Sequence, residues 1–110
     1  MAGEPSHFEL GVPDAARAKR FYGEVLGWQF HTTKGEWAWI ETGGVRGGLH
    51  DGAGEREVVL YFSVADIEAA VRRVRKLGGQ AEDPGPPTSG GRYVTCRDDQ
   101  GLVFGLHQPA

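Results

Sequence analysis

The 110-residue sequence contains one cysteine, Cys96, and one methionine. A single cysteine cannot form an intrachain disulfide or supply a cysteine metal cluster, so a disulfide-stabilised scaffold is excluded. No apolar run approaches the length that crosses a bilayer, and no charged-then-apolar leader precedes Phe8. We therefore expect a cytoplasmic protein that does not span a membrane.

The chain has few positive charges: 12 lysines and arginines against 15 aspartates and glutamates give a net charge of −3. Nucleic-acid surfaces need clustered lysine and arginine. The basic run at residues 72–76 lies near the end of a predicted helix, where it suits the helix dipole as a solvated face. The glycines of 43–48 lack the Lys-Ser/Thr pair and the following helix of a phosphate loop. We predict no nucleic-acid partner and find no nucleophile motif.

One short pattern occurs twice, half a chain apart. A Val-Pro-Asp triplet at 12–14 opens a helical stretch that closes with Leu-Gly at 26–27. A Val-Ala-Asp triplet at 64–66 opens another that closes with Leu-Gly at 77–78. Recurrence at a nearly fixed offset indicates an internal repeat. Residues 1–110 are therefore expected to form a single domain of two modules.

The first module covers about residues 7–50. Apolar and polar residues alternate over 7–12, which predicts a strand. Asp14 is a suitable N-cap and Gly27 a suitable left-handed C-cap, so we expect a helix between them. The apolar stripe of this helix comprises Ala18, Phe21, Tyr22, Val25 and Leu26. Further strands are expected at 28–32, 36–42 and 46–50.

The second module covers about residues 57–108 and follows a polar linker at 51–56. It opens with a strand at 57–64 and a helix capped by Asp66. The residues expected on the core side of the strand are Val58, Leu60, Phe62 and Val64. Further strands are expected at 80–83, 92–98 and 102–108. The segment 83–91 contains three prolines and three glycines, which predicts an irregular loop.

The strand faces that point away from the helices are polar and aromatic. The residues on these faces include His7, Glu9, Trp37, Trp39, Tyr61 and His107. We therefore predict an α+β fold of two tandem βαβββ modules, with a curved, partly open mixed sheet around a central trough and a helix outside each module. A concave site lined by aromatic side chains and a few polar groups is typical of a small-molecule pocket.

Four segments carry a resemblance to a known family. They are VPDAARAKRFYGEVLGWQF at 12–30, GGL at 47–49, SVAD at 63–66 and GGRYVTCRDDQGLVFGL at 90–106. The chain resembles the vicinal-oxygen-chelate superfamily, which includes glyoxalase I, the bleomycin-resistance proteins and the extradiol dioxygenases. The resemblance implies the duplicated βαβββ fold and a homodimer, but not the function, because this fold hosts unrelated chemistries.

The resemblance also implies where a divalent metal would be held, by four inward side chains. His7 matches the first ligand position and His50 can match the second. The third position falls on Val59 and the fourth on Gly105, whose side chains cannot ligate a metal. His107 lies two residues beyond the fourth position and on the same face. A site of His7, His50 and His107 would suit Zn or Ni, with Fe or Mn as further candidates. The alternative interpretation is that each histidine is a hydrogen-bonded residue in the wall or rim of the trough.

Other side chains on the polar face could contact a ligand. Trp37 and Trp39 could stack on a planar molecule, or they could pack a subunit interface. Tyr61 could supply a hydrogen bond and Arg92 an anion contact, although Arg92 could equally be a surface residue. His7 and Glu9 are two residues apart on one strand face and could act as an acid–base pair, or simply form a paired wall.

The leading prediction is metal-independent binding of a small planar or aromatic organic molecule, similar to the drug-sequestering bleomycin-resistance branch. The alternative is an enzyme of the superfamily. One form is a metal-dependent lyase, isomerase or dioxygenase, and the other is a metal-free enzyme that uses His7 or Glu9 as a base. A third possibility is an auxiliary domain without a small-molecule role. No cofactor is expected other than a divalent metal in the first enzyme form.

Overall fold

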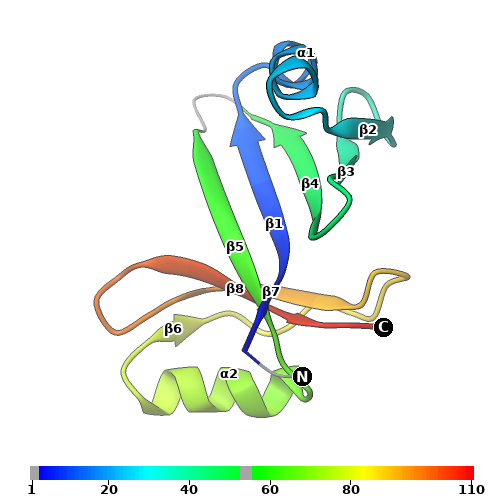
Figure 1. The fold of residues 1–110 in the computed structure, drawn as a ribbon. Helices are drawn as coiled ribbons and strands as arrows, with labels where there is room; N and C mark the ends of the chain where they lie inside the picture. Colours follow the sequence, from blue (N-terminus) through cyan, green and yellow to red (C-terminus); the bar gives the residue numbers. More distant parts are fainter. Residues whose placement is uncertain (1–2, 53–55) are drawn as a thin grey trace. The chain divides into compact units, whose positions relative to one another are not determined.

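The computed structural model describes residues 3–52 and 56–110, so residues 53–55 of the expected linker lie outside the described residues. The chain divides into two compact units. We call His7–Val59 the N-terminal unit, and the described residues up to Ser6 with Leu60–Ala110 the C-terminal unit. Strand, helix and three further strands follow one another twice along the chain (Figure 1). The predicted α+β fold with a duplicated βαβββ order is confirmed.

The N-terminal unit holds the first set of elements. They are β1 (Pro5–Val12) from His7 onward, α1 (Ala15–Leu26), β2 (Gln29–Thr32), β3 (Ala38–Glu41) and β4 (Arg46–Asp51). The strand order is β2-β3-β4-β1, and β1 runs parallel to β4 while the other pairs are antiparallel. Asp14 caps α1 through a bond from the Arg17 N–H to its Oδ1 at 3.1 Å, and Gly27 ends the helix at φ 73°. Both predicted caps are confirmed.

The core of this unit lies between α1 and the sheet. Its buried residues are Leu10, Ala15, Ala18, Ala38, Ile40 and Leu49. The predicted helix stripe is wrong in part, because Phe21 is 60% exposed and Val25 59% exposed. The helix turns the small side chains of Ala15 and Ala18 toward the sheet, and the larger residues of the stripe lie beside that contact.

The C-terminal unit repeats the order. Its elements are α2 (Ile67–Lys76), β6 (Gln80–Ala81), β7 (Arg92–Arg97), β8 (Val103–Gln108) and the part of β5 (Glu57–Ser63) from Leu60 onward. The strand order is β5-β8-β7-β6, with β5 parallel to β8 and the remaining pairs antiparallel. The helix α2 packs on β6, β7 and β8. The buried residues of this core are Ile67, Val71, Val94, Cys96 and Leu106. Neither α1 nor α2 is long and apolar enough to cross a membrane.

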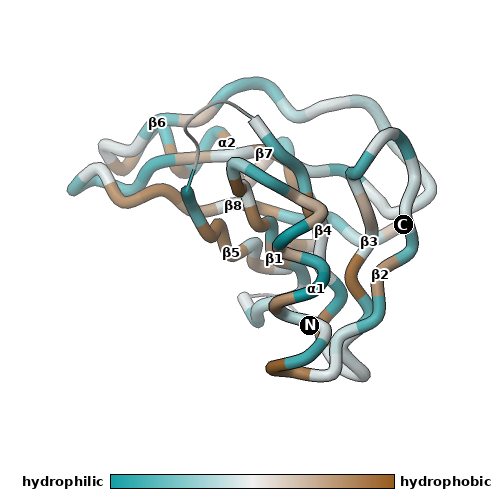
Figure 2. The backbone as a smooth tube through the Cα atoms, turned by 90° about the horizontal axis from the view of Figure 1, so that it is seen from above, coloured by the Kyte–Doolittle hydropathy of each residue, from teal (hydrophilic) through white to brown (hydrophobic). Residues whose placement is uncertain are grey.

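The strand β5 is hydrophobic along most of its length (Figure 2). The predicted facing agrees with the register, because Phe62 lies opposite Leu106 of the core beneath α2 and Tyr61 lies opposite Gly105 on the other face. The expected burial is wrong, because Val58 is 64% exposed and Leu60 46% exposed while Val59 and Tyr61 are buried. The helix α2 covers the neighbouring strands of its own unit and packs on β8 rather than over Val58 and Leu60. The irregular segment 83–91 agrees with the predicted loop and contains one isolated bridge, between Thr88 and Gly91.

Candidate functional site

A cavity of about 340 Å³ lies in the N-terminal unit on the sheet face away from α1. Its lining residues are Glu9, Thr33, Trp37, Ala38, Trp39, Gly48, Leu49 and His50. They come from β1, β3, β4 and the turn before β3. The cavity therefore gathers a carboxylate, an imidazole and two indoles on one wall.

The Glu9 carboxylate lies between two imidazoles. Its Oε2 is 2.7 Å from His7 Nε2, and its Oε1 is 3.2 Å from His50 Nδ1. His7 is 2% exposed, whereas the side chains of Glu9 and His50 keep 25% and 28% of their surface. His7 is thus a buried support, and Glu9 and His50 are accessible from the cavity.

The hydrogen bonds define the imidazole tautomers. An ionised carboxylate only accepts hydrogen bonds, so both imidazoles must donate to Glu9. His7 then carries its proton on Nε2 and His50 on Nδ1 when the rings are neutral. Nε2 of His50 is then the acceptor nitrogen of that ring.

The backbone register explains why these groups meet. In the parallel pair of β1 and β4, Glu9 lies opposite Gly48, and His50 lies opposite Gly11, so all four share one sheet face. A Cβ on Gly48 would lie 2.4 Å from Glu9 Oε2, which means that the carboxylate occupies the space over this glycine. Gly48 is therefore a site residue that carries no reactive side chain, and the Gly-Gly pair at 47–48 is its only signal in the sequence.

The two tryptophans of the cavity have different surroundings. The Arg46 guanidinium lies 4.6 Å from the centre of the Trp39 ring, and the His7 ring approaches Trp39 edge-on at 6.1 Å. Trp37 is 50% exposed; its Nε1 donates to Asp51 Oδ1 at 3.1 Å and its ring lies 5.9 Å from that of His50. Trp39 is thus a fixed wall, and Trp37 offers the larger open surface to a planar ligand.

The predicted residues of the C-terminal unit lie in another environment. Tyr61 is buried, its hydroxyl is 3.2 Å from Thr95 Oγ1, and its ring meets that of Tyr93 edge-on at 5.7 Å. A Cβ on Gly105 would lie 2.1 Å from the Tyr61 ring. The Tyr61 ring therefore fills the space over Gly105, where the family pattern places its fourth metal ligand.

Both ring nitrogens of His107 have hydrogen-bond partners. Nε2 donates to the Gly90 carbonyl at 2.9 Å, so Nδ1 accepts from the Ser6 hydroxyl at 2.8 Å. The ring also stacks on Tyr93 with 4.5 Å between the ring centres. Two hydrogen bonds and one stacking contact therefore fix the His107 side chain within the C-terminal unit.

Arg92 lies apart from Tyr61 and His107. In the β7–β8 register it shares a face with Gln108, so it points to the side of the sheet that α2 covers. Its Nε donates to the Gly85 carbonyl at 2.9 Å, and its Nη1 lies 3.2 Å from Glu68 Oε2.

The donor set does not fit the four-ligand metal site of the family. Val59 is buried and apolar, Gly105 is covered by Tyr61, and His107 is bound through both ring nitrogens. Within residues 3–52 and 56–110, no three or more His, Cys, Asp or Glu side chains are grouped so that they could hold a metal ion. The metal site of His7, His50 and His107 stays a prediction.

Comparisons with known proteins give one family match and several fold matches. The sequence profile of the Glyoxalase/Bleomycin resistance protein/Dioxygenase superfamily matches residues 5–106. Among the curated proteins, no sequence matches this chain.

The solved structures that resemble the chain share its fold at low sequence identity. Methylmalonyl-CoA epimerase from Mycobacterium tuberculosis is 20% identical, with a TM-score of 0.75 over 97% of this chain and 88% of that chain. A hypothetical protein from Bacillus halodurans is 15% identical, with a TM-score of 0.77 over 98% and 95%. Methylmalonyl-CoA epimerase from Streptomyces coelicolor, in complex with 2-nitronate-propionyl-CoA, is 19% identical, with a TM-score of 0.72 over 100% and 99%.

Proposed function

Because the chain belongs to the Glyoxalase/Bleomycin resistance protein/Dioxygenase superfamily, we propose that it binds a small planar organic molecule in the cavity of its N-terminal unit, without a metal. The single observation that carries this proposal is the position of Trp37. Trp37 is half exposed and lines the same cavity as Glu9. The cavity volume of about 340 Å³ lies within the range that small ligands occupy, about 300–1,000 Å³.

The wall chemistry supports a preference for ligands that carry a hydrogen-bond donor or a positive charge. Glu9 accepts bonds from two imidazoles and still has lone pairs for a ligand. The faces of Trp37 attract cations through the ring quadrupole. A planar aromatic cation would satisfy both groups, whereas an anion would meet the carboxylate.

Calorimetric titration with two planar probes tests this function. We expect the cation proflavine to bind saturably and the anion 1-anilinonaphthalene-8-sulfonate to bind more weakly. Trp37→Ala and Glu9→Gln should each weaken proflavine binding about tenfold or more, as expected when a stacking or charged contact is removed. Trp28→Phe is the matched control, because Trp28 packs in the core against Tyr22 and Phe8. Equal loss in all three variants would contradict the proposal.

A second candidate function is metal-free proton transfer to and from carbon. The 3.2 Å contact between Glu9 Oε1 and His50 Nδ1 favours it, because a carboxylate paired with an imidazole is a common arrangement for general acid–base catalysis. An epimerase must remove and return a proton at a stereocentre, and two of the structural neighbours described above are named methylmalonyl-CoA epimerase.

Exchange of deuterium from solvent into methylmalonyl-CoA, followed by NMR with a chelator present, tests this candidate. Exchange by the wild type that is lost in His50→Gln and Glu9→Gln would support it. Exchange that vanishes with the chelator alone, or no exchange at all, would rule out a metal-free epimerisation of this substrate. Neither result affects the binding test with proflavine.

A further inference from the structure

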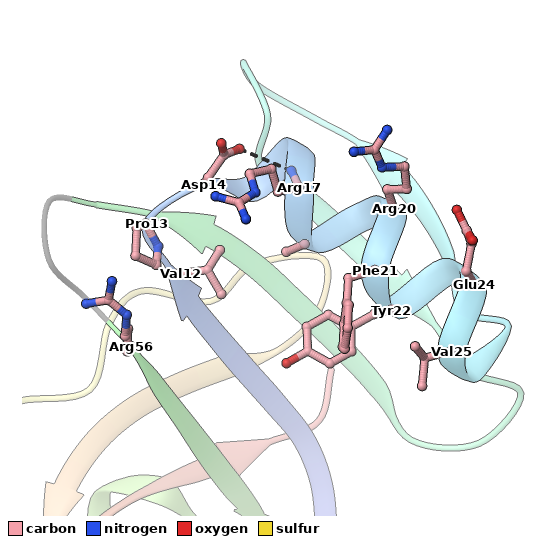
Figure 3. Close-up of a pocket in the computed structure, with 11 residues that line it drawn as sticks. Val12, Pro13, Asp14, Arg17, Arg20, Phe21, Tyr22, Glu24, Val25 and Arg56 are labelled. Carbon is pink, nitrogen blue, oxygen red and sulfur yellow. Dashed lines mark hydrogen bonds between the residues drawn. The ribbon is translucent and has the colours of Figure 1, made fainter.

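A second cavity in the N-terminal unit, of about 630 Å³, lies beside α1 (Figure 3). We call it the α1 groove. Its lining residues come from α1, from the end of β1 with the two residues that follow it, and from Arg56 just before β5. Its volume lies within the range that small ligands occupy, about 300–1,000 Å³. It shares no lining residue with the cavity of Glu9 and Trp37, so the two sites can be tested separately.

The apolar wall of the α1 groove is open to solvent. Phe21 is 60% exposed and Val25 59% exposed, and Val12 and Tyr22 add further apolar surface. The Tyr22 ring already stacks on Trp28 with 5.4 Å between the ring centres, and Phe21 meets Tyr22 edge-on at 5.2 Å. These contacts favour a ligand that needs apolar area rather than a free ring to stack on. A flexible alkyl chain is such a ligand, because its gain depends on buried area alone.

Positive charge is in excess in the α1 groove. Five charged residues line it, three arginines and two acids: Asp14, Arg17, Arg20, Glu24 and Arg56. The groove therefore has a net charge of +1, three minus two, on a chain whose net charge is −3. Within residues 3–52 and 56–110, no ion pair joins any of these three guanidinium groups to an acidic side chain. An anion is the ligand that these charges complement.

The positive excess lies at one end of the α1 groove. Figure 3 shows Arg17 and Arg56 at the end where β1 leads into α1, whereas Arg20 and Glu24 lie farther along the helix. Arg20 and Glu24 are four residues apart on α1, so their opposite charges are neighbours and offset each other. Asp14 is the only acid at the other end, and its Oδ1 accepts from the Arg17 backbone N–H as the helix cap. Two guanidinium groups thus face one carboxylate there.

The position of Arg17 disfavours the helix that carries it. Arg17 lies in the first turn of α1, which has no acidic residue, whereas α2 has Glu68 in its first turn. A positive charge at a helix N-terminus opposes the helix dipole. Helix stability therefore does not explain an arginine at this position, whereas contact with an anion does.

We propose that the α1 groove binds a medium-chain fatty carboxylate. The carboxylate accepts hydrogen bonds from Arg17 and Arg56, because guanidinium groups offer paired donors that match its two oxygens. The alkyl chain lies along α1 and covers Phe21 and Val25. Arg17 and Val25 are eight residues apart, about 12 Å along the helix axis, which is comparable to the extended length of octanoate.

Calorimetric titration with octanoate and octanamide tests the site, because the two probes share an alkyl chain and differ in the charge of the head group. We expect octanoate to bind at one site per chain, about tenfold more tightly than octanamide. Arg17→Gln and Arg56→Gln should each weaken octanoate binding about threefold, as expected for an exposed ion pair. Arg73→Gln is the matched control, because Arg73 is an exposed arginine of α2, and it should leave octanoate binding unchanged.

A charge reversal gives a sharper test. The double variant Arg17→Glu, Arg56→Glu leaves four acids and one arginine in the groove, so octanamide should then bind more tightly than octanoate. Arg17→Glu suits the helix dipole, so loss of α1 does not account for this reversal. Phe21→Ser should weaken the binding of both probes about tenfold, because the apolar wall is common to them.

Three results would overturn the proposal. They are an octanoate titration without saturable binding, octanamide that binds the wild type as tightly as octanoate, and a loss in Arg73→Gln equal to that in Arg17→Gln. Proflavine should bind Arg17→Gln as it binds the wild type, because Arg17 does not line the cavity of Trp37. Failure of this proposal is therefore distinguishable from failure of the proposed function.

Discussion

The substitution Gly105→Ala tests the contact between β5 and β8 that closes the family's metal position. A Cβ at residue 105 would lie 2.1, 2.3 and 2.5 Å from three atoms of the Tyr61 ring, whereas ordinary contact begins at 3.4 Å. The ring would have to retreat by more than an ångström. Tyr61 is 8% exposed and its ring meets that of Tyr93 edge-on, so a ring that moves disturbs this contact.

The cost has two parts. Forcing a methyl group into a packed site destabilises by about 1–3 kcal/mol. The displaced ring also loses the bond between its hydroxyl and Thr95 Oγ1, now 3.2 Å, which is worth about 1 kcal/mol. We expect Gly105→Ala to lower the free energy of unfolding by about 2–4 kcal/mol, measured by urea denaturation followed by circular dichroism.

A double-mutant cycle shows whether the Tyr61 ring is the cause. In a Tyr61→Ala background, the added methyl group has room, so Gly105→Ala should then cost less than about 0.5 kcal/mol, the usual limit of additivity error. If Gly105→Ala costs the same in both backgrounds, or costs nothing in the wild type, the proposed contact is wrong. The same contact predicts that Gly105→Glu alone cannot restore a metal ligand.

Three further predictions concern stability and reactivity. Gly23→Ala should raise the free energy of unfolding by about 0.5–1 kcal/mol in urea denaturation, because the new Cβ meets only ordinary contacts in α1; a loss would contradict this. Hydrogen bonds from the backbone N–H groups of Leu102 and Gln100 lower the pKa of the Asp98 carboxyl group. The ionised carboxylate therefore stabilises the fold at pH values above the usual pKa of aspartate, and this stabilisation is lost as pH falls through the lowered pKa of the folded protein. In Asp98→Asn, the urea concentration at the unfolding midpoint should fall less steeply at acid pH than in the wild type. An equal fall in both proteins would refute the assignment. Burial raises the pKa of the Cys96 thiol, so at pH 8 Ellman's reagent should react slowly with the native protein and rapidly only in urea that unfolds it. Rapid reaction of the native protein would refute this.

Local features of the fold were predictable from the sequence. Asp14, Gly27 and Asp66 set helix ends through bonds within a few residues, so their types and positions suffice to predict them. Which face of β5 is buried was not predictable by alternation, because the strand reads Val-Val-Leu-Tyr-Phe and is apolar on both faces. The outcome depends on contacts that are distant in sequence, since α2 packs on β6, β7 and β8 and leaves Val58 and Leu60 exposed.

The site was predictable to a similar degree. Alternation along β1 placed His7 and Glu9 on one face, but not the 3.2 Å contact of Glu9 with His50, which depends on the register of β1 against β4. The roles of Gly48 and Gly105 were hidden for another reason. Each serves by leaving space for a partner side chain, and a residue that acts through a missing Cβ has no chemical signature of its own.

The most direct test of the central claim is a proflavine titration followed by tryptophan fluorescence, in wild type and Trp37→Ala, with and without EDTA. Metal-independent binding at Trp37 predicts saturable quenching in the wild type, with the same half-saturation in both buffers, and its loss in Trp37→Ala. Quenching that disappears with EDTA, or that survives unchanged in Trp37→Ala, would contradict the account.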